Sequence, residues 1–346
     1  MSVMNPAPDG RSRPWSHRAF DHSPVSLPWS GVVLAVGFVL VFILMEFVLG
    51  RFTEYEFEAY REDLRLAFVL CLAAAYLPVA SIYLVRSARR TLDELAPVVE
   101  QTGGTAGLEE AGDYDRSRLR RAGVVGVCLQ LVTIVSLELD LSDLTALGQM
   151  SPEAYFHRVI LIWIGWFGGR VVYATWIEST RFSEIGREWV KIDLLDVAAV
   201  APLSQFGLRH ALVTIGLFSL IAPMFYDAKA APNLIWILLV ATLLTLSLAV
   251  ACLLLPVRGV QHAIAREKAR ELARINDQIR RVLSASGSLS QPDLSDWIAY
   301  RGLIESVREW SVDAPTLRRF ALYLAIPLGS WFGGALVERM VDTLLD

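Results

Sequence analysis

The chain has 346 residues, of which 54% are hydrophobic, and its formal net charge is −4. Because the apolar residues are gathered into long runs, this composition is typical of an integral membrane protein and not of a soluble globular domain. The negative net charge gives no support to nucleic-acid binding, and the basic clusters sit at the ends of the apolar runs.

Seven apolar runs approach the length of about 20 residues that a helix needs to cross a bilayer. They cover residues 30–50, 65–86, 122–139, 158–177, 208–226, 232–256 and 318–337. The fifth and seventh are shorter and contain Pro223 and Pro327, so each could be a broken or re-entrant segment instead of a full span. We therefore expect an all-α polytopic membrane protein with about seven transmembrane helices.

The arginines predict the orientation of these helices. They cluster after the second run and before the third and seventh runs, and by the positive-inside rule this places the N-terminus in the cytoplasm. The arginines concerned are Arg86, Arg89, Arg90, Arg118, Arg120, Arg121, Arg318 and Arg319. No small-residue cleavage pattern follows the first run, which is expected to stay as an anchor. A bacterial-type inner (plasma) membrane is the expected location.

This orientation divides the chain into an N-terminal cytoplasmic tail, a membrane domain, an inner helical segment and a last span. The tail is 1–29. The membrane domain is 30–256, with about six spans, a cytoplasmic linker at 87–121 and an interfacial segment at 179–207. A cytoplasmic amphipathic segment follows at 257–317, and 318–346 holds the last span and a short outer tail.

The inner segment contains two predicted amphipathic helices. The first, at 267–283, carries an apolar stripe of Leu272, Ile275, Ile279 and Val282; the second, at 293–310, carries Leu294, Trp297, Ile298, Ile304 and Val307. Residues 258–281 are rich in basic side chains. Packing against other inner segments is the leading interpretation of this basic stretch, while contact with anionic lipid or with a helical partner remains an alternative.

Arg170 is the most unusual residue of the apolar runs. A helix rise of 1.5 Å per residue places it about 18 Å from Arg158, which lies at the outer rim, and therefore near the midplane of the bilayer. A charge at that depth needs a polar partner or water. Gln130 is predicted at a matching depth, and further polar candidates are Tyr76, Tyr173, Thr242 and Thr245.

Three interpretations of Arg170 remain open. A structural role, with bonds to neighbouring helices, is the leading one; an anion or substrate pathway and a side chain that extends to the inner headgroups are the alternatives. Glu46 is a further polar residue within a run, whereas Glu138 and Arg158 lie at the outer rims, where extension into the headgroups explains them.

Two similar glycine pairs predict close helix packing. The stretches GWFGG and GSWFGG place Gly165 with Gly169, and Gly329 with Gly333, four residues apart on one helix face. Small residues at this spacing let two backbones approach within a bilayer. The two faces are expected to pack on each other inside one protomer, and contact with a second copy in a homo-oligomer is the alternative.

The sequence offers no pattern for catalysis, for a cofactor or for a metal. Its histidines form no H-E-x-x-H motif and its serines no nucleophile elbow. Asp193 and Asp196 are three residues apart, but a solvated edge explains them better than a cation site. Two functions remain: a non-catalytic scaffold or signalling component, which is favoured, and a channel or transporter whose polar path includes Arg170, Gln130 and the helices broken at Pro78, Pro223 and Pro327.

Overall fold

The computed structural model describes residues 26–48, 57–99, 114–138, 152–221, 232–284, 291–310 and 317–325. These residues form α2 (Leu27–Val48), α3 (Phe57–Leu95), α5 (Arg116–Glu138), α6 (Pro152–Glu188), the 3₁₀ helix η3 (Val197–Val200), α7 (Ala201–Ile221), α8 (Pro232–Ser284), α9 (Gln291–Ser306) and a helical stretch at 317–325. Within these ranges there is no strand, and an isolated antiparallel bridge joins Val99 to Val190. The all-helical fold is therefore confirmed for the described ranges.

Four helices are long and apolar enough to cross a membrane. They are Leu27–Val48, Leu64–Leu95, Ala154–Glu188 and Leu239–Ser284, which overlap with the first, second, fourth and sixth predicted runs. The count of seven is not confirmed. The third run is α5, whose first two turns hold four arginines; the fifth run begins in α7 and continues beyond the described residues, and most of the seventh lies outside them.

The outer faces of several helices are apolar. On α2, α5 and α8 the exposed side chains include Trp29, Val33, Leu40, Phe47, Val125, Leu129, Val132, Trp236, Leu243 and Leu244. Exposed apolar surface costs roughly 25 cal/mol per Å² in water, and so many exposed large apolar side chains along three helices are unusual on a soluble monomer. A hydrocarbon environment suits it, which agrees with the lengths of the candidate spans.

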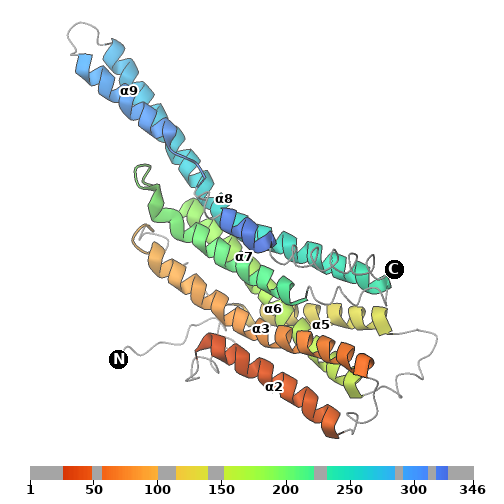
Figure 1. Ribbon diagram of the computed structural model, residues 1–346. Coiled ribbons are helices and arrows are strands. Elements are labelled where there is room, and N and C mark those ends of the chain that lie inside the picture. The colour runs from red at the N-terminus through yellow and green to blue at the C-terminus, as the bar shows by residue number, and fades with distance from the viewer. Residues whose placement is uncertain are drawn as a thin grey trace, which may run out of the picture.

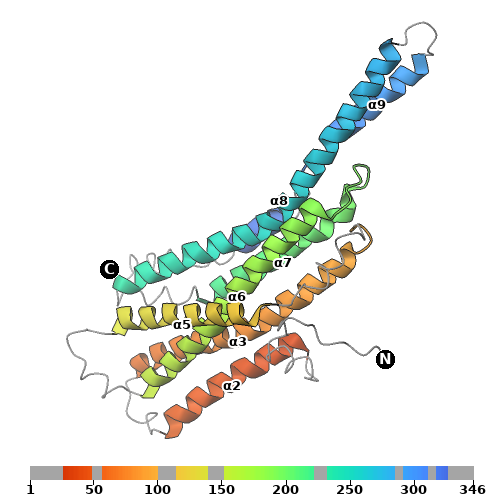
Figure 2. The same ribbon diagram turned by 180° about the vertical axis from the view of Figure 1, so that it is seen from behind.

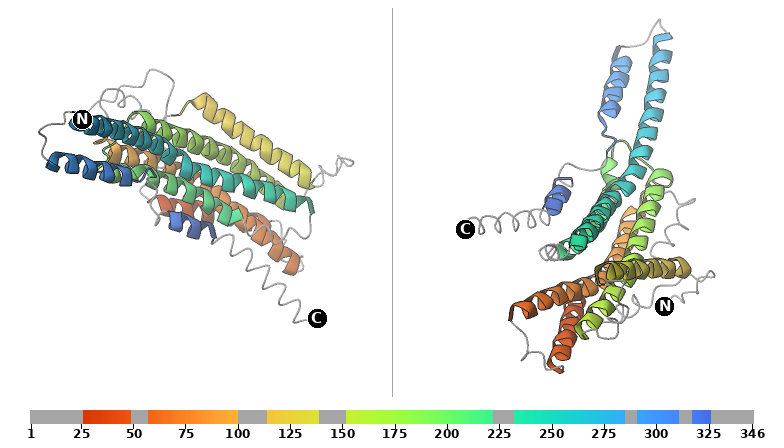
Figure 3. Two further views of the ribbon diagram at one scale, coloured as in Figure 1. Left: turned by 90° about the horizontal axis from the view of Figure 1, so that it is seen from above. Right: turned by 90° about the vertical axis from the view of Figure 1, so that its right-hand side faces the viewer.

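α6 lies at the centre of the helix arrangement, where it contacts α3, α5, α7 and α8 (Figure 1). α2 packs beside α3 at one edge, and α5 crosses α6 on the far side of the bundle (Figure 2). α8 extends past the ends of the other helices and there pairs with α9 (Figure 3). We call this region, where α8 and α9 pair, the hairpin end.

The crossing of α5 and α6 is a contact between two backbones. A side-chain carbon added at Gly126 would lie 2.0 Å from the carbonyl oxygen of Gly165, and one added at Gly169 would lie 2.2 Å from that of Ala122. No residue larger than glycine fits at such distances without moving a helix. Gly165 and Gly169 thus face α5, whereas Gly329 and Gly333, their expected partners, lie outside the described residues.

Glycines also lie at the crossings nearer the hairpin end. A carbon added at Gly259 of α8 would lie 1.9 Å from the carbonyl oxygen of Ser183 on α6, and one added at Gly207 of α7 would lie 2.8 Å from that of Leu253 on α8. α6, α7 and α8 therefore approach one another closely just before the chain leaves the apolar region.

α8 runs unbroken for 53 residues, so the boundary expected between 256 and 257 falls inside a helix. Pro256 lies within α8, and the helix changes direction part-way along its length (Figure 1). Proline is the commonest cause of such a bend, because it removes one backbone hydrogen bond and clashes with the preceding turn. The apolar and basic parts of α8 are nevertheless one continuous element.

A hydrophobic core holds the hairpin end together. Ile275 of α8 and Ile304 of α9 are fully buried in it, together with side chains of α3, α6 and α7 such as Leu95, Phe182 and Phe206. Leu272 and Ile279 pack against the same core, as the stripe at 267–283 predicts. On α9 the prediction was wrong at one position: Ile298 is 56% exposed, and Tyr300 packs inward instead.

The segment expected at 179–207 is not one interfacial helix. Residues 179–188 complete α6, the chain then turns, and the next helical turns are η3 and α7. Asp193 explains part of the interruption, because its carboxylate accepts a hydrogen bond from the backbone N–H of Leu195 at 2.9 Å. Such a bond stabilises a turn in competition with a helix.

The crossing of α5 and α6 gives a direct prediction for Gly126→Ala. The added methyl group collides with backbone and not with a mobile side chain, so we expect the free energy of unfolding in mixed micelles to fall by about 1–3 kcal/mol. Gly37→Ala is the matched control, since nothing lies within 4 Å of that position. Equal stability of the two variants would show that the crossing does not have this geometry.

Candidate functional site

Arg170 lies against aromatic rings. The central carbon of its guanidinium is 5.7 Å from the ring centroid of Trp166 and 5.7 Å from that of Phe167. The side chain is half-buried, and within the described ranges it has no hydrogen bond or ion pair. Cation–π contacts of this kind stabilise a partly desolvated arginine by about 1–2 kcal/mol.

The other predicted polar residues do not gather around Arg170. Gln130 lies beside Gly165, where its side chain would be 2.8 Å from an added carbon, and no hydrogen bond joins it to Arg170. The Tyr76 hydroxyl donates to the Val213 carbonyl oxygen at 2.7 Å and so connects α3 with α7. Tyr173 packs beside a small cluster that contains Ala174.

Glu46 is 2% exposed on α2 and lies far along the chain from these residues. Phe42, one turn before it, stacks on His157 of α6 with 6.1 Å between the ring centroids. Glu46 therefore belongs to the contact between α2 and the first turns of α6. It does not join Arg170 and Gln130 in a common polar path.

A buried polar layer lies between the apolar part of the helices and the hairpin end. Its members come from α3, α6, α7 and the segment that leads into α5, and each is at most 8% exposed: Ser87, Thr91, Tyr114, Thr175, Glu178, Ser179, His210 and Thr214. Burying so many polar groups is costly unless neighbouring groups compensate them. This layer is our candidate functional site.

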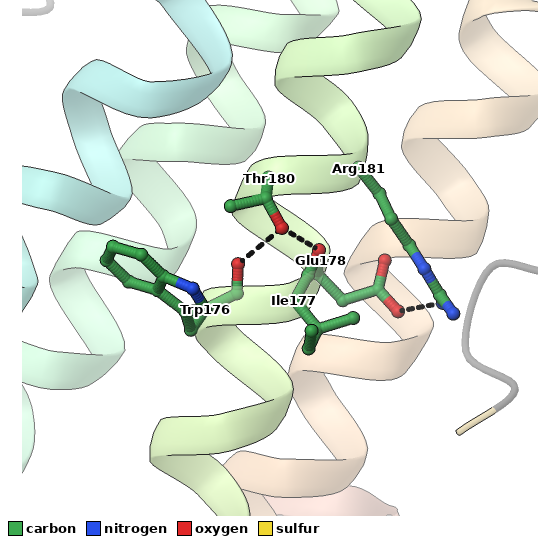
Figure 4. A network of polar contacts seen from close by, with 5 residues as sticks. All are labelled: Trp176, Ile177, Glu178, Thr180 and Arg181. Carbon is green, nitrogen blue, oxygen red and sulfur yellow. Dashed lines mark hydrogen bonds and ion pairs between the residues drawn. The ribbon is translucent and has the colours of Figure 1, made fainter. Parts of the chain in front are cut away.

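Glu178 is the charged member of the buried polar layer. Its carboxylate is 1% exposed and lies 3.4 Å from a guanidinium nitrogen of Arg181, one turn further along α6 (Figure 4). Thr180 points away from this pair and donates to the carbonyl oxygens of Trp176 and Ile177 at 3.1 and 2.8 Å. Arg170, Ala174, Glu178 and Arg181 follow one another at spacings of 4, 4 and 3, so they share one face of α6.

Tyr114 covers this face of α6. It is 3% exposed, packs with Val85, Leu119 and Ala174, and is followed by Asp115, whose carboxylate accepts a hydrogen bond from the N–H of Ser117 at 2.8 Å and so caps α5. Burial raises the pKa of Tyr114 well above its ordinary value, and the negative charge of Glu178 raises it further. The start of α5 is thereby fixed against α6.

His210 lies on the α7 side of α6. The centroid of its ring lies 3.9 Å from that of Phe206, with the two planes tilted by 40°, and Phe206 is in turn 3.9 Å from Phe182 of α6. Its Nδ1 lies 3.1 Å from the Phe206 carbonyl oxygen, which accepts a hydrogen bond. His210 and Ser179 are each 0% exposed, so a substrate could not reach either of them in this structure. Their position suits helix packing better than nucleophilic catalysis.

A cavity of about 500 Å³ opens at the hairpin end. Its wall combines apolar side chains such as Val99 and Leu195 with the carboxylates of Asp193, Glu267 and Glu271, and Tyr300 of α9. The Tyr300 hydroxyl donates to Glu271 at 3.1 Å. No cluster of three or more histidine, cysteine or carboxylate side chains within the described ranges could hold a metal ion.

The basic residues of α8 cap the ends of other helices. Arg266 donates to the Arg187 carbonyl oxygen in the last turn of α6 at 2.5 Å. Lys268 donates to the carbonyl oxygens of Glu305 and Val307, at the end of α9, at 2.8 and 2.9 Å. Carbonyl groups at helix C-termini lack partners in the helix, and a cation there is favourable.

Comparison with known proteins finds no matching protein family, no similar curated protein and no similar solved structure. The site is therefore defined by its geometry alone. Sequence reasoning missed Glu178 and His210 because both resemble ordinary residues at the rim of a span. The spacing of Arg170, Glu178 and Arg181 on one helix face was a readable signal for part of the layer.

We predict that Lys268→Met weakens the pairing of α8 and α9. It leaves the last carbonyl groups of α9 without their cation, which lowers the free energy of opening α9 by about 1–2 kcal/mol. Amide hydrogen exchange in α9 then becomes about 5–30 times faster. Arg270→Met removes an equal charge whose ion pair within the described ranges is with Glu267 of its own helix, and it should leave exchange in α9 unchanged.

The raised pKa of Tyr114 gives a prediction at alkaline pH. A group that stays protonated in the fold stabilises it below its ordinary pKa of about 10, and this stabilisation is lost as the pH rises further. Tyr114→Phe should therefore lose less stability between pH 9 and pH 11 than the wild type, as measured by thermal unfolding. Tyr155→Phe, at an exposed site, should retain the wild-type slope. An unchanged slope in Tyr114→Phe would contradict the burial of its hydroxyl.

Proposed function

We propose that this protein is a non-catalytic membrane scaffold or signalling component. The observation that carries the proposal is α8, which continues from an apolar, bilayer-length segment into the helical pair with α9. At 1.5 Å per residue, 53 residues extend for about 80 Å, far more than the ~30 Å of the hydrocarbon layer. Such a helix fixes the hairpin end at a set position relative to the bilayer.

The arrangement supports an orientation in which the hairpin end is cytoplasmic. The exposed arginines of α5 and those near the end of α3 lie toward that end, as the positive-inside rule requires. α5 is proposed as a further span, although its first turns are basic, because its exposed side chains from Val124 to Val135 are apolar. With the segments beyond the described residues, about seven spans remain our proposal, in an inner (plasma) membrane with a cytoplasmic N-terminus.

The cavity at the hairpin end is the proposed contact for a partner protein. Its lining includes Asp193, Glu267, Glu271 and Lys191. Glu267 and Glu271 are paired with Arg270 and Arg274 of α8, so the carboxylate of Asp193 is the lining charge that favours a partner segment with basic side chains. The caps made by Arg266 and Lys268 favour the packing interpretation of residues 258–281 over a flat contact with anionic lipid.

The transport alternative needs polar groups that converge on one path. Arg170 packs on aromatic rings, Tyr76 is bonded to α7, and Gln130 lies beside Gly165. These placements favour structural roles for all three residues. The burial of His210 and Ser179 likewise favours a protein without catalytic activity.

Two measurements on one liposome preparation test the proposal. We expect no ion flux above that of empty vesicles, for wild type and for Arg170→Leu. We also expect one narrow distribution of distances between a spin label on Cys128, which is exposed on α5, and one on Arg301→Cys of α9, with no change under an ion gradient. Cys71 and Cys252 are buried and should not be labelled.

The opposite results would support transport. Flux that disappears in Arg170→Leu, at equal insertion, would identify a charge-lined path. Two distance populations whose ratio depends on the gradient would indicate alternating conformations in place of a fixed scaffold.

A further inference from the structure

The crossing of α5 and α6 revises the depth of Arg170. Gly126 lies against Gly165, and Ala122 against Gly169, so the two antiparallel helices are in a register that places Arg121 level with Arg170. Arg116, Arg118, Arg120 and Arg121 form the basic start of α5, and exposed apolar residues begin at Val124. Arg170 therefore lies where α5 changes from basic to apolar, which is the depth of lipid headgroups and not of the bilayer midplane.

Within the described ranges, the guanidinium of Arg170 meets no acceptor at this depth. It has five N–H donors, and among the described residues none of them meets an oxygen. The central carbon of the guanidinium lies 5.7 Å from the ring centroids of Trp166 and of Phe167, and aromatic rings offer no oxygen acceptor to its N–H groups. An arginine at the membrane boundary can reach lipid headgroups, and a bidentate oxyanion is the group that matches its fork geometry best.

The surroundings of Arg170 indicate where such an oxyanion comes from. Trp166 packs on Gly123 of α5, with 2.8 Å between its ring and an added carbon, so Arg170 lies on the Gly123 side of the crossing. Val127 and Leu131 follow Gly123 at spacings of four on the same face of α5; Val127 is half-buried and Leu131 is exposed, so this surface is apolar. A ligand with an anionic phosphate and hydrocarbon chains fits both the guanidinium and this surface.

We propose that Arg170 is the binding site for the phosphate of an anionic phospholipid in the leaflet on the hairpin side. The acyl chains lie along the apolar face of α5, and the phosphate oxygens accept hydrogen bonds from the guanidinium edge. The proposal does not depend on the scaffold function, because a lipid at this site would be compatible with either function class.

Titrating lipid into the purified full-length protein tests this site. Thermal unfolding is followed in a neutral detergent as phosphatidylglycerol is added, with phosphatidylcholine as the neutral lipid. We expect phosphatidylglycerol to raise the unfolding temperature of the wild type at lower concentration than phosphatidylcholine. Arg170→Gln should raise the half-maximal phosphatidylglycerol concentration about fivefold or more, the effect of removing one arginine near anionic lipid.

Arg121→Gln is the matched control, because it removes the same charge at the same depth. Arg121 precedes Ala122 on α5, whereas Arg170 follows Gly169 on α6, so in this antiparallel pair their side chains point to opposite sides of the crossing. We expect a shift of twofold or less for Arg121→Gln. Equal shifts in the two variants, or none in Arg170→Gln, would overturn the proposal.

Two further measurements cover the remaining outcomes. Inorganic phosphate at about 10 mM should not replace the lipid. Stabilisation equal to that of phosphatidylglycerol would assign the site to a small anion. If Arg170→Gln does not fold, phosphatidylglycerol with a photoreactive group near its headgroup is crosslinked to the wild type. Labelling of α6 around Arg170 is expected, and labelling confined to other helices would overturn the proposal.

Discussion

The close approach of backbones along α6 is the constraint on which the other contacts depend. Gly165 and Gly169 admit α5, and Ser183 meets Gly259 of α8, so that α6 is held by close backbone contacts at two levels along its length. In a bilayer, lipid chains are as apolar as the side chains, and helix association must come from close packing and polar contacts. The glycines supply that closeness, and the buried polar layer between the two levels can form because the backbones there are already fixed.

The polar layer and the hairpin core stabilise different parts of the molecule. Glu178, Arg181 and Tyr114 fix the start of α5 on α6, whereas Ile275 and Ile304 bury the contact between α8 and α9. The first contact relies on charge and hydrogen bonding at low dielectric, and the second on apolar burial in contact with water. Lys268 combines a polar contact with this apolar pairing, because its ammonium group donates a hydrogen bond to a carbonyl oxygen at the end of α9.

The sequence predicted the features that depend on periodicity and composition. The all-helical class, the apolar runs with clear length and the stripe of Leu272, Ile275 and Ile279 all follow from local patterns. The helix that packs on Gly165 and Gly169 could not be predicted from local patterns, because a small-residue face specifies close approach but not which helix approaches. Ile298 was assigned inward because it is apolar, although Tyr300 continues the 3/4 spacing of Trp297, Ile304 and Val307 and Ile298 lies about half a turn from Val307. The buried polar layer required contacts between helices far apart in sequence, which spacing along one helix cannot show.

The continuity of α8 has a mechanical consequence. The 28 residues after Pro256 form an arm of about 42 Å, and the bend lies close to where Gly259 meets Ser183. A change of 10° in the direction of the membrane part, with the hairpin core and the ends of α3, α6 and α7 that belong to it turning together, would displace the far end of the hairpin by about 7 Å. Small changes of tilt among lipid-embedded helices therefore produce larger displacements at a distance from the bilayer, and the pivot lies at the glycine contact on α6.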